Sequence, residues 1–346
     1  PPPPPPPPPP PRDSIRRQRQ MCIRDRIQAA YDDPEALAAL AAEADVVTYE
    51  FENVPSEAVR LLGENVRVFP AANALATAQD RLNEKNMFVE LGIPVPKFHA
   101  VSSLEELAAA VTDIGFPCVL KTRRFGYDGK GQVVIRSAEE LASAWQEIAE
   151  APAIVESFMP FDREVSVIAV RDSQGNHQTY PLSENIHKHG ILKQSWSRAH
   201  DPVSRQAEAY VTRLMDALGY VGVLALELFQ AGDQLYANEF SPRVHNSGHW
   251  TIEGTACSQF ENHIRAVAGM PLGEIKLTGS SVMLNCIGDM PDVSGLGKQV
   301  GVVVHDYGKA ARPGRKVGHI TMTAESDDAL ERLLQTVQPK LSTDRT

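Results

Sequence analysis

The chain has 346 residues, of which 42% are apolar and 23% charged, so it is long enough for about two or three compact globular domains. Its formal net charge of −10 argues against nucleic acid as the main partner, because proteins that bind the phosphate backbone present a basic surface. The sequence has no apolar run of membrane-spanning length and no secretory signal, and its four cysteines are too widely spaced for a zinc site or a disulfide framework, which favours a cytoplasmic protein without a membrane partner.

The first 26 residues differ in composition from the rest of the chain. Residues 1–11 are an unbroken proline run, and residues 12–26 are rich in arginine. Polyproline can be a rigid spacer or a ligand for aromatic grooves. A homopolymer joined abruptly to a globular pattern is more typical of a tag, a fusion scar or a translation artefact. We therefore expect residues 1–26 to be a non-native or disordered segment.

Next comes a short pattern typical of α/β proteins. Two strands separated by a helix predict a βαβ-like fragment, and the loop over 50–55 follows the first strand, where α/β sheets place ligands. A later helix ends at Gly92, and a proline-containing linker follows it. The predicted elements are helices over 34–43 and 80–91, strands over 45–49 and 66–69, and the linker 93–96.

The following segment alternates helices and strands around a basic, glycine-rich turn. The turn, residues 121–132, lets backbone amides approach phosphate oxygens, and Lys121 and Lys130 add positive charge. It is not a Walker A motif, and a plain hairpin turn is the alternative interpretation. The predicted elements are helices over 103–114 and 138–149 and strands over 118–121, 133–135, 154–156 and 164–170, the last with Val165, Val167 and Ala169 alternating with polar or exposed neighbours.

A hairpin further along carries two glutamates. Glu227 and Glu239 are equally distant from Asp233 in the turn between strands 221–229 and 234–240, so we expect them to face each other across the strands. Like charges there destabilise a sheet, and a bound magnesium ion would remove the conflict, with Asn238 adding a neutral oxygen. A solvated edge hairpin is the alternative. A helix over 205–218, with apolar residues on one face, precedes the hairpin.

The remaining chain contains two polar segments. Residues 238–250 offer donors for an anionic substrate and a candidate proton carrier, or form a hydrogen-bonded structural loop. Residues 312–319 form a cationic turn that suits a phosphate, although a solvated basic turn explains it equally well. The other predicted elements are helices over 260–268 and from 327, and strands over 281–287, 300–307 and 316–323. No hydrolase or zinc-enzyme motif is present.

Four segments, in this order, resemble the signatures of the ATP-grasp superfamily and, within it, of the N5-carboxyaminoimidazole ribonucleotide synthetases of purine biosynthesis. They are residues 49–55, 126–132, 242–250 and 312–319, and the match runs from about Asp45 to about Thr323. The resemblance implies a mixed α/β (α+β) ATP-grasp fold with a truncated doubly wound N-terminal domain, because the proline and arginine stretch replaces the family's first strand and glycine-rich loop. It divides the chain into a partial pre-ATP-grasp domain (27–96), a lid domain (97–180), a catalytic domain with the metal hairpin (181–275), a small β-rich domain (276–338) and a tail (339–346).

The resemblance also implies an activity. The family carboxylates 5-aminoimidazole ribonucleotide with bicarbonate, using ATP and two magnesium ions, through carboxyphosphate, and releases ADP and phosphate. It implies a cytoplasmic homodimer that acts on small molecules. Two alternatives stay open: a formate-activating ATP-grasp ligase acting on glycinamide ribonucleotide, and a nucleotide-binding module with impaired catalysis.

Residue by residue, the resemblance implies three sets of ligands. ATP would contact Arg81, Lys121, Gly126, Tyr127, Asp128, Gly129, Lys130, Gly131, Gln132, Glu156, Ser157, Phe158, Met159, Glu164, His187, Asn238 and Glu239. The ribonucleotide would contact Glu52, Tyr127, Asp128, Arg243, His245, Asn246, Ser247, Arg315 and Lys316. Magnesium would be held by Glu227, Asn238 and Glu239. We expect Asp128 and Lys316 to orient the amine and move its proton, with Arg243 and His245 also catalytic.

Overall fold

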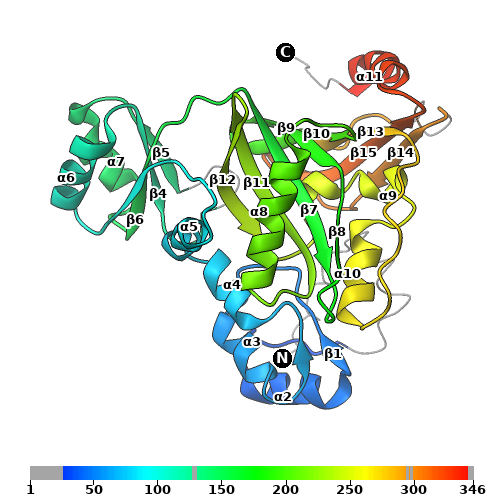
Figure 1. Cartoon of the computed structure of the whole chain (residues 1–346), viewed down its shortest axis with the longest axis horizontal. Coiled ribbons are helices and arrows are strands. Elements are labelled where there is room, and N and C mark those ends of the chain that lie inside the picture. The colour runs from blue at the N-terminus through cyan, green and yellow to red at the C-terminus, as the bar shows by residue number, and fades with distance from the viewer. Residues whose placement is uncertain (1–25, 127–130, 294–295, 297–298, 342–346) are drawn as a thin grey trace, which may run out of the picture.

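The structure, a computed structural model, describes residues 26–126, 131–293, 296 and 299–341. It begins with a small unit, seen at the bottom of Figure 1, in which two short parallel strands flank a helix. This arrangement confirms the predicted βαβ fragment, and the first helix has the predicted bounds. Its elements are α2 (Pro34–Glu43), β1 (Val46–Val47), α3 (Ser56–Leu62), β2 (Arg67–Val68) and α4 (Ala72–Ala78).

A four-stranded antiparallel sheet forms the second unit, in the order β3-β6-β4-β5. Its helices bury Leu107, Val111 and Trp145 against the strands. The helix α5 (Arg81–Glu90) lies between this sheet and the larger one (Figure 1). The elements of the second unit are β3 (Phe98–Val101), α6 (Leu104–Ile114), β4 (Cys118–Thr122), β5 (Gln132–Ile135), the 3-10 helix η1 (Ala138–Glu140), α7 (Leu141–Glu147) and β6 (Ala153–Ser157).

A nine-stranded sheet forms the centre of the molecule, in the order β12-β11-β7-β9-β10-β13-β15-β14, with β8 beside β7. Because β7 belongs to this sheet, the two sheets divide the chain between Ser157 and Arg163, earlier than the expected domain boundary at 180. The β10–β13 pairing carries the sheet across the expected boundary at 275. The strands are β7 (Arg163–Arg171), β8 (His177–Thr179), β9 (Leu182–Lys188), β10 (Ile191–Arg198), β11 (Gly222–Ala231), β12 (Gln234–Ser241), β13 (Ser280–Ile287), β14 (Val302–Asp306) and β15 (Lys316–Ala324).

Helices cover both faces of this sheet, which corrects one prediction. The residues expected to lie between Val165, Val167 and Ala169 at polar or exposed positions are buried as well: Ile168 and Val170 have no exposed surface. One face of β7 packs in the core with α8, and the other packs near α10. The helices on this sheet are α8 (Ser204–Ala217), η2 (Asn246–Gly248), α9 (Thr251–Gly254), α10 (Gln259–Val267) and α11 (Asp327–Leu341). Among the described residues, no helix combines the length and the apolar character that crossing a membrane requires.

Candidate active site

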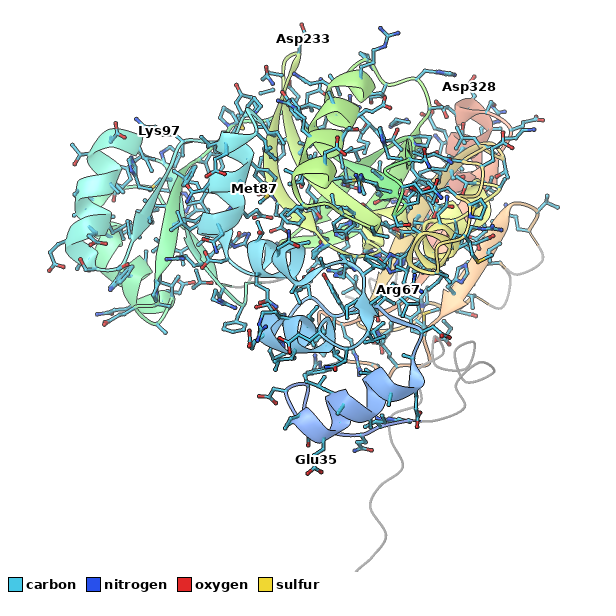
Figure 2. The ribbon with its side chains drawn as sticks, turned by 60° about the horizontal axis from the view of Figure 1, so that its bottom comes forward. Glu35, Arg67, Met87, Lys97, Asp233 and Asp328 are labelled. Atoms are coloured by element: carbon cyan, nitrogen blue, oxygen red, sulfur yellow. The ribbon has the colours of Figure 1, made fainter. Side chains whose placement is uncertain are left out.

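The two glutamates of the hairpin are cross-strand partners, as predicted. Glu227 of β11 pairs with Glu239 of β12, and Figure 2 shows Asp233 at the tip of the hairpin. The register, however, depends on a bulge. Ala231 pairs with Gln234, so an unbroken ladder would place Asn238 opposite Glu227; the extra residue lies between the pairs 227–239 and 228–237. Two residues of β12 therefore oppose Glu227, and a bulge of this kind redirects side chains near a site.

Nitrogen atoms of three side chains lie close to the acidic face that Glu227, Asn238 and Glu239 form. Arg81 Nη1 lies 2.7 Å from Glu239 Oε2, His245 Nε2 lies 3.0 Å from Glu227 Oε1, and Lys121 Nζ lies 3.5 Å from Asn238 Oδ1. Burial alone would raise the pKa of Glu239, but the charge of Arg81 lowers it to about 2. Since 38% of the Glu239 side-chain surface remains exposed, this ionised carboxylate is accessible to a ligand.

Behind this face lies a buried ion cluster. Glu156 of β6 forms ion pairs with Lys85 Nζ at 2.9 Å and with Lys121 Nζ at 2.5 Å, and its side chain is 3% exposed. Burial opposes its ionisation, but the two lysine charges lower the pKa of Glu156 to about 2. The cluster joins β4, β6 and α5, and through Asn238 it reaches the hairpin. It therefore fixes the four-stranded sheet to the large one.

The start of α5 is held by Arg123, which directly follows β4 of the four-stranded sheet. Asp80 caps the helix by accepting from Leu82 N at 3.0 Å, and its carboxylate binds the guanidinium of Arg123 at 2.9 and 2.6 Å. Arg81 N in turn donates to Arg123 O at 2.9 Å. These contacts place Arg81 beside the acidic hairpin. The Asp80–Arg123 pair is one that the sequence pattern does not predict.

His187 and Glu164 form a second pair on the large sheet. His187 Nδ1 lies 2.7 Å from Glu164 Oε2, and each side chain is about one-fifth exposed. Burial lowers the pKa of His187, but the carboxylate of Glu164, with the more distant Glu227 and Glu239, raises it overall. The charges of Glu227 and Glu239 therefore act on the protonation of His187, although the two glutamates do not contact it.

The loop after β12 faces the N-terminal unit. Arg243 Nε donates to Glu52 Oε2 at 2.9 Å. The segment around Glu52 is anchored because Gln79 Nε2 donates to Glu52 O at 2.8 Å and to Val54 O at 2.6 Å. Gln259, at the start of α10, also anchors the loop, because its Oε1 accepts from His245 N at 3.0 Å. Residues far apart in sequence thus meet around the Arg243 guanidinium.

A row of buried hydrogen bonds leads to His245. Ser195 Oγ donates to Asn185 Oδ1 at 2.7 Å, Asn185 Nδ2 donates to Ser166 Oγ, and Ser166 Oγ donates to Ser247 Oγ at 3.0 Å. Ser247 N donates to His245 Nδ1 at 3.3 Å, and Ser247 Oγ lies 2.8 Å from the same nitrogen. Because Nδ1 accepts a backbone proton, this hydrogen-bond pattern assigns the neutral ring as the Nε2–H tautomer.

The same loop is tied to the C-terminal strands. Asn246 and Asn285 exchange amide hydrogen bonds at 3.1 and 2.7 Å. Tyr307 OH lies 3.2 Å from His249 Nδ1 and 2.7 Å from His319 Nδ1. Burial, assisted by neighbouring cations that include Lys316, lowers the pKa of His249 to about 3, so its ring is neutral at pH 7.

The predicted cationic turn near the C-terminus is a tight, hydrogen-bonded turn. Arg315 N donates to Arg312 O at 3.0 Å, and Gly314 has a φ of +74°, a conformation that favours glycine. Gly288 N donates to Arg315 O at 2.7 Å, which fixes the turn to the end of β13. Lys316 begins β15, and its charge is among those that lower the pKa of His249.

Direct contacts join the described site residues into one larger group and two separate pairs. The larger group follows the hairpin and consists of Arg81, Glu239, Glu227, His245 and Ser247, with Asn238, Lys121 and Glu156 joined to it along β12. Glu164 pairs with His187, Glu52 pairs with Arg243, and Asn246 contacts Asn285. The other described site residues lie on the same strands or on the turns that join them: Gly126, Gly131, Gln132, Ser157, Phe158, Met159, Arg315 and Lys316. Tyr127, Asp128, Gly129 and Lys130 lie outside the described residues.

Two residues that the sequence analysis did not single out are built into this site. Glu84 and Lys85 lie on α5 and are each 1% exposed. A signal for them exists in the sequence: positions 81, 84, 85 and 88 share one helix face, and three of the four carry charge. The pattern places these charged residues in line with the apolar Phe88, and their burial follows from the strand that packs against α5.

The donor set of the hairpin fits magnesium. Glu227, Asn238 and Glu239 offer three hard oxygen ligands around one bulge. Across the part of the chain that the structure describes, no group of three or more His, Cys, Asp or Glu side chains could hold a metal ion on its own. A site that combines one or two carboxylates with substrate phosphates is the usual arrangement for magnesium, so the hairpin can hold this ion together with a nucleotide.

Three family models match the chain. They are the ribonucleotide synthetase preATP-grasp domain at residues 17–79, the ATP-grasp domain at residues 86–260 and the phosphoribosylaminoimidazole carboxylase C-terminal domain at residues 281–333. The first match begins inside the segment that we expected to lie outside the fold. Together they confirm the mixed α/β ATP-grasp fold with an N-terminal pre-ATP-grasp part and a C-terminal part.

Similar proteins from three organisms are named as synthases or synthetases of N5-carboxyaminoimidazole compounds. The N5-carboxyaminoimidazole ribonucleotide synthase of Pseudomonas aeruginosa is 49% identical over 314 residues, 91% of this chain and 87% of that protein. The crystal structure of the synthetase from Thermus thermophilus matches with a TM-score of 0.86 at 48% identity, over 92% of this chain and 88% of that one. The Aspergillus clavatus synthase in complex with ADP and 5-aminoimidazole ribonucleotide matches with a TM-score of 0.85 at 28% identity, over 94% and 89%. The chain belongs to the N5-carboxyaminoimidazole ribonucleotide synthase family of ATP-grasp ligases.

Proposed function

We propose that this chain carboxylates the exocyclic amine of 5-aminoimidazole ribonucleotide, using ATP and bicarbonate, and releases ADP and phosphate. The observation that carries the proposal is the acidic face of Glu227, Asn238 and Glu239, which faces Arg81 and Lys121 in a chain of this family. The family also supports the carboxylating reaction over formate activation and over a non-catalytic module.

ATP would meet basic side chains that already have carboxylate partners. Arg81 and Lys121 are balanced by Glu239 and Glu156, at 2.7 and 2.5 Å. Phosphate oxygens would join these contacts, because guanidinium and ammonium groups bind them with charge-assisted hydrogen bonds. Phosphoryl transfer depends mainly on positioning and on charge stabilisation of this kind. Magnesium, held by the hairpin oxygens, would neutralise the charge that develops on the phosphates.

The chemistry consists of two displacements. A bicarbonate oxygen attacks the γ-phosphorus, the bond to the bridging oxygen breaks, and ADP leaves. The amine nitrogen then attacks the carbonyl carbon of carboxyphosphate, the carbon–oxygen bond to phosphate breaks, and the nitrogen loses its proton. Carboxyphosphate hydrolyses readily, so the active site must exclude water while this intermediate is present.

The hydrogen bonds of His245 favour a role in positioning a neighbouring side chain over a role as a proton carrier. Its Nδ1 is occupied by Ser247 N–H, and its Nε2–H points to Glu227 Oε1 at 3.0 Å. A ring held in this tautomer donates, and its accepting nitrogen is turned away from the acidic face. We assign His245 to the orientation of Glu227. Asp128 and Lys316 remain our candidates for orienting the amine and moving its proton, and Asp128→Asn should lower turnover.

Arg243 and Glu52 form the other half of the substrate site. Their contact at 2.9 Å joins the loop after β12 to the N-terminal unit. Arg243 is 23% exposed and Glu52 is 35% exposed, so both can reach a small ligand. We assign them to the ribonucleotide together with Asn246 and Ser247, and we assign its phosphate to Arg315 and Lys316.

An isotope experiment tests the proposed route. Bicarbonate labelled with ¹⁸O should transfer one labelled oxygen to the phosphate product, because the attacking oxygen stays on phosphorus when carboxyphosphate is cleaved. Phosphate with no label above the exchange background would exclude carboxyphosphate. A control with 5-aminoimidazole ribonucleotide omitted measures the label that uncoupled hydrolysis contributes.

We further propose a cytoplasmic homodimer. The family resemblance supports both features, and Cys118, Cys257 and Cys286 are buried free thiols, as suits a reducing compartment. Sedimentation of the purified chain at micromolar concentration would give twice the mass of 37.8 kDa for a dimer. A mass of 37.8 kDa at all concentrations would contradict this part of the proposal.

A further inference from the structure

The metal hairpin ends the large sheet, so within the described parts of the chain one side of β12 has no neighbouring strand. Around the bulge, its outward backbone groups are bound by α5 and the linker instead. Ala237 N donates to Pro94 O at 2.7 Å, Lys85 Nζ donates to Ala237 O at 3.1 Å, and Phe240 N donates to Glu84 Oε1 at 2.6 Å. In Figure 2, Met87 marks α5 beside the hairpin strands. An edge strand is thus bound by side chains at two points only three residues apart.

These two points enclose the bulge. In a regular strand, every second residue turns its backbone N–H and C=O groups toward the same side. Here the residues that do so are 237 and 240, three positions apart, because Asn238 is the extra residue of the bulge. The bulge interrupts the ladder, so the pairing with β11 alone specifies this register weakly. A slip of one residue would turn Glu239 away from Glu227.

The identity of the two side chains is also unusual. Glu84 and Lys85 are each 1% exposed, and charged side chains are almost never buried without partners. Their partners are the hairpin backbone and Glu156, and neither residue belongs to the ATP or ribonucleotide sets above.

We propose that Glu84 and Lys85 are positioning residues that clamp β12 on both sides of the Asn238–Glu239 bulge and so hold the metal-facing oxygens in place before magnesium and nucleotide bind. This rests on the proposed function, which assigns that face to magnesium and ATP. Lys85 also contacts Glu156 at 2.9 Å, so the same clamp connects the hairpin with β6.

Hydrogen exchange at single-amide resolution tests the clamp without any ligand. In Glu84→Leu, which fills a similar volume without an acceptor, the Phe240 amide should exchange at least ~10-fold faster than in the unmodified chain. Glu84→Gln keeps an acceptor oxygen and should restore protection. The Ala237 amide, which binds Pro94 O, serves as the internal control. Equal Phe240 exchange in all three proteins would overturn the proposal.

Calorimetry then tests the functional part, with ADP as the probe. Glu84→Leu should weaken ADP binding about 10-fold with magnesium present and less than about 2-fold in EDTA, because the clamp acts on the metal-facing oxygens. A merely structural role would weaken both equally, and that result, or no loss in either condition, would overturn the proposal. Lys85→Met repeats the test from the other side of the bulge.

Two further outcomes distinguish a failure of the magnesium assignment from a failure of the clamp. If the unmodified chain bound ADP equally with and without magnesium, the magnesium assignment of the proposed function would fail, while the exchange experiment would still decide the clamp. If neither variant folded, exchange in the unmodified chain would decide: a Phe240 amide that exchanges as fast as that of Asp233 at the hairpin tip would overturn the clamp, and a protected one would support it.

Discussion

Replacing Glu156 by glutamine should destabilise the protein by several kcal/mol. The carboxylate is shared by Lys85 and Lys121 at 2.9 and 2.5 Å, and Glu156→Gln leaves both ammonium groups without it. Breaking a buried ion pair from one side costs about 3–5 kcal/mol. The pKa gives a similar figure: it falls from 4.5 to about 2 on folding, and a difference of about 2.5 corresponds to about 3 kcal/mol at neutral pH.

Urea unfolding followed by tryptophan fluorescence measures this cost. Glu156→Gln and Lys85→Met should each lose about 3–5 kcal/mol, and the double variant should be at least about 1.5 kcal/mol more stable than the sum of the single losses predicts, because it removes a charge together with its partner. Since the folded pKa of Glu156 is lowered, its contribution is present above pH 4.5 and is lost as the pH falls toward 2. Additive losses, or single losses below about 1 kcal/mol, would refute the reasoning.

Three further changes test other parts of the site. Glu239→Gln should lower ATP turnover at least ~100-fold, because it removes a metal-facing charge; steady-state ADP release within tenfold of the unmodified enzyme would contradict this. Arg243→Lys should raise KM for the ribonucleotide about tenfold with a smaller effect on kcat, because an ammonium group cannot reproduce the guanidinium fork, and an unchanged KM would argue against the contact. Burial lowers the pKa of His249 to about 3 and of His319 to about 2, so the unfolded chain binds more protons below pH 6.5 and stability should fall as the pH drops from 6.5 to 4.5; a flat urea midpoint over that range would disprove it.

Local patterns were sufficient for much of the fold. The helix over 34–43 is found with those bounds, because Asp33 caps it and accepts from Glu35 N and Ala36 N at 3.0 Å. The apolar face of α8 is buried as its periodicity predicts. These features depend on residues close together in sequence, which is where propensity and capping rules apply.

The sequence analysis did not predict β9 and β10, and their composition explains why. β9 and β10 carry Ser183, Asn185, Ser195 and Ser197 at buried positions, so they lack the apolar alternation that predicts a strand. Those polar residues are satisfied by one another and by distant partners, such as Ser247 O, which accepts from Ser183 Oγ at 3.0 Å. A network of this kind exists only in the folded protein and leaves no periodic signal.

The acidic pair was predicted correctly, although the reasoning lacked one element. Equal distance from Asp233 gave the right partners, but the two-residue turn would pair Glu227 with Asn238, and only the bulge restores the pair with Glu239. Likewise, Glu84 and Lys85 resemble solvated helix residues until the edge strand beside them is known. Tertiary contacts at the edge of a sheet are what the sequence alone does not supply.

The central claim is that this chain couples ATP cleavage to carboxylation of 5-aminoimidazole ribonucleotide. The most direct test is ADP release by the purified 346-residue chain with ATP, magnesium and bicarbonate, with and without the ribonucleotide. We predict that release is stimulated by the ribonucleotide and depends on bicarbonate. Release that is indifferent to the ribonucleotide, or that responds instead to formate with glycinamide ribonucleotide, would contradict the account.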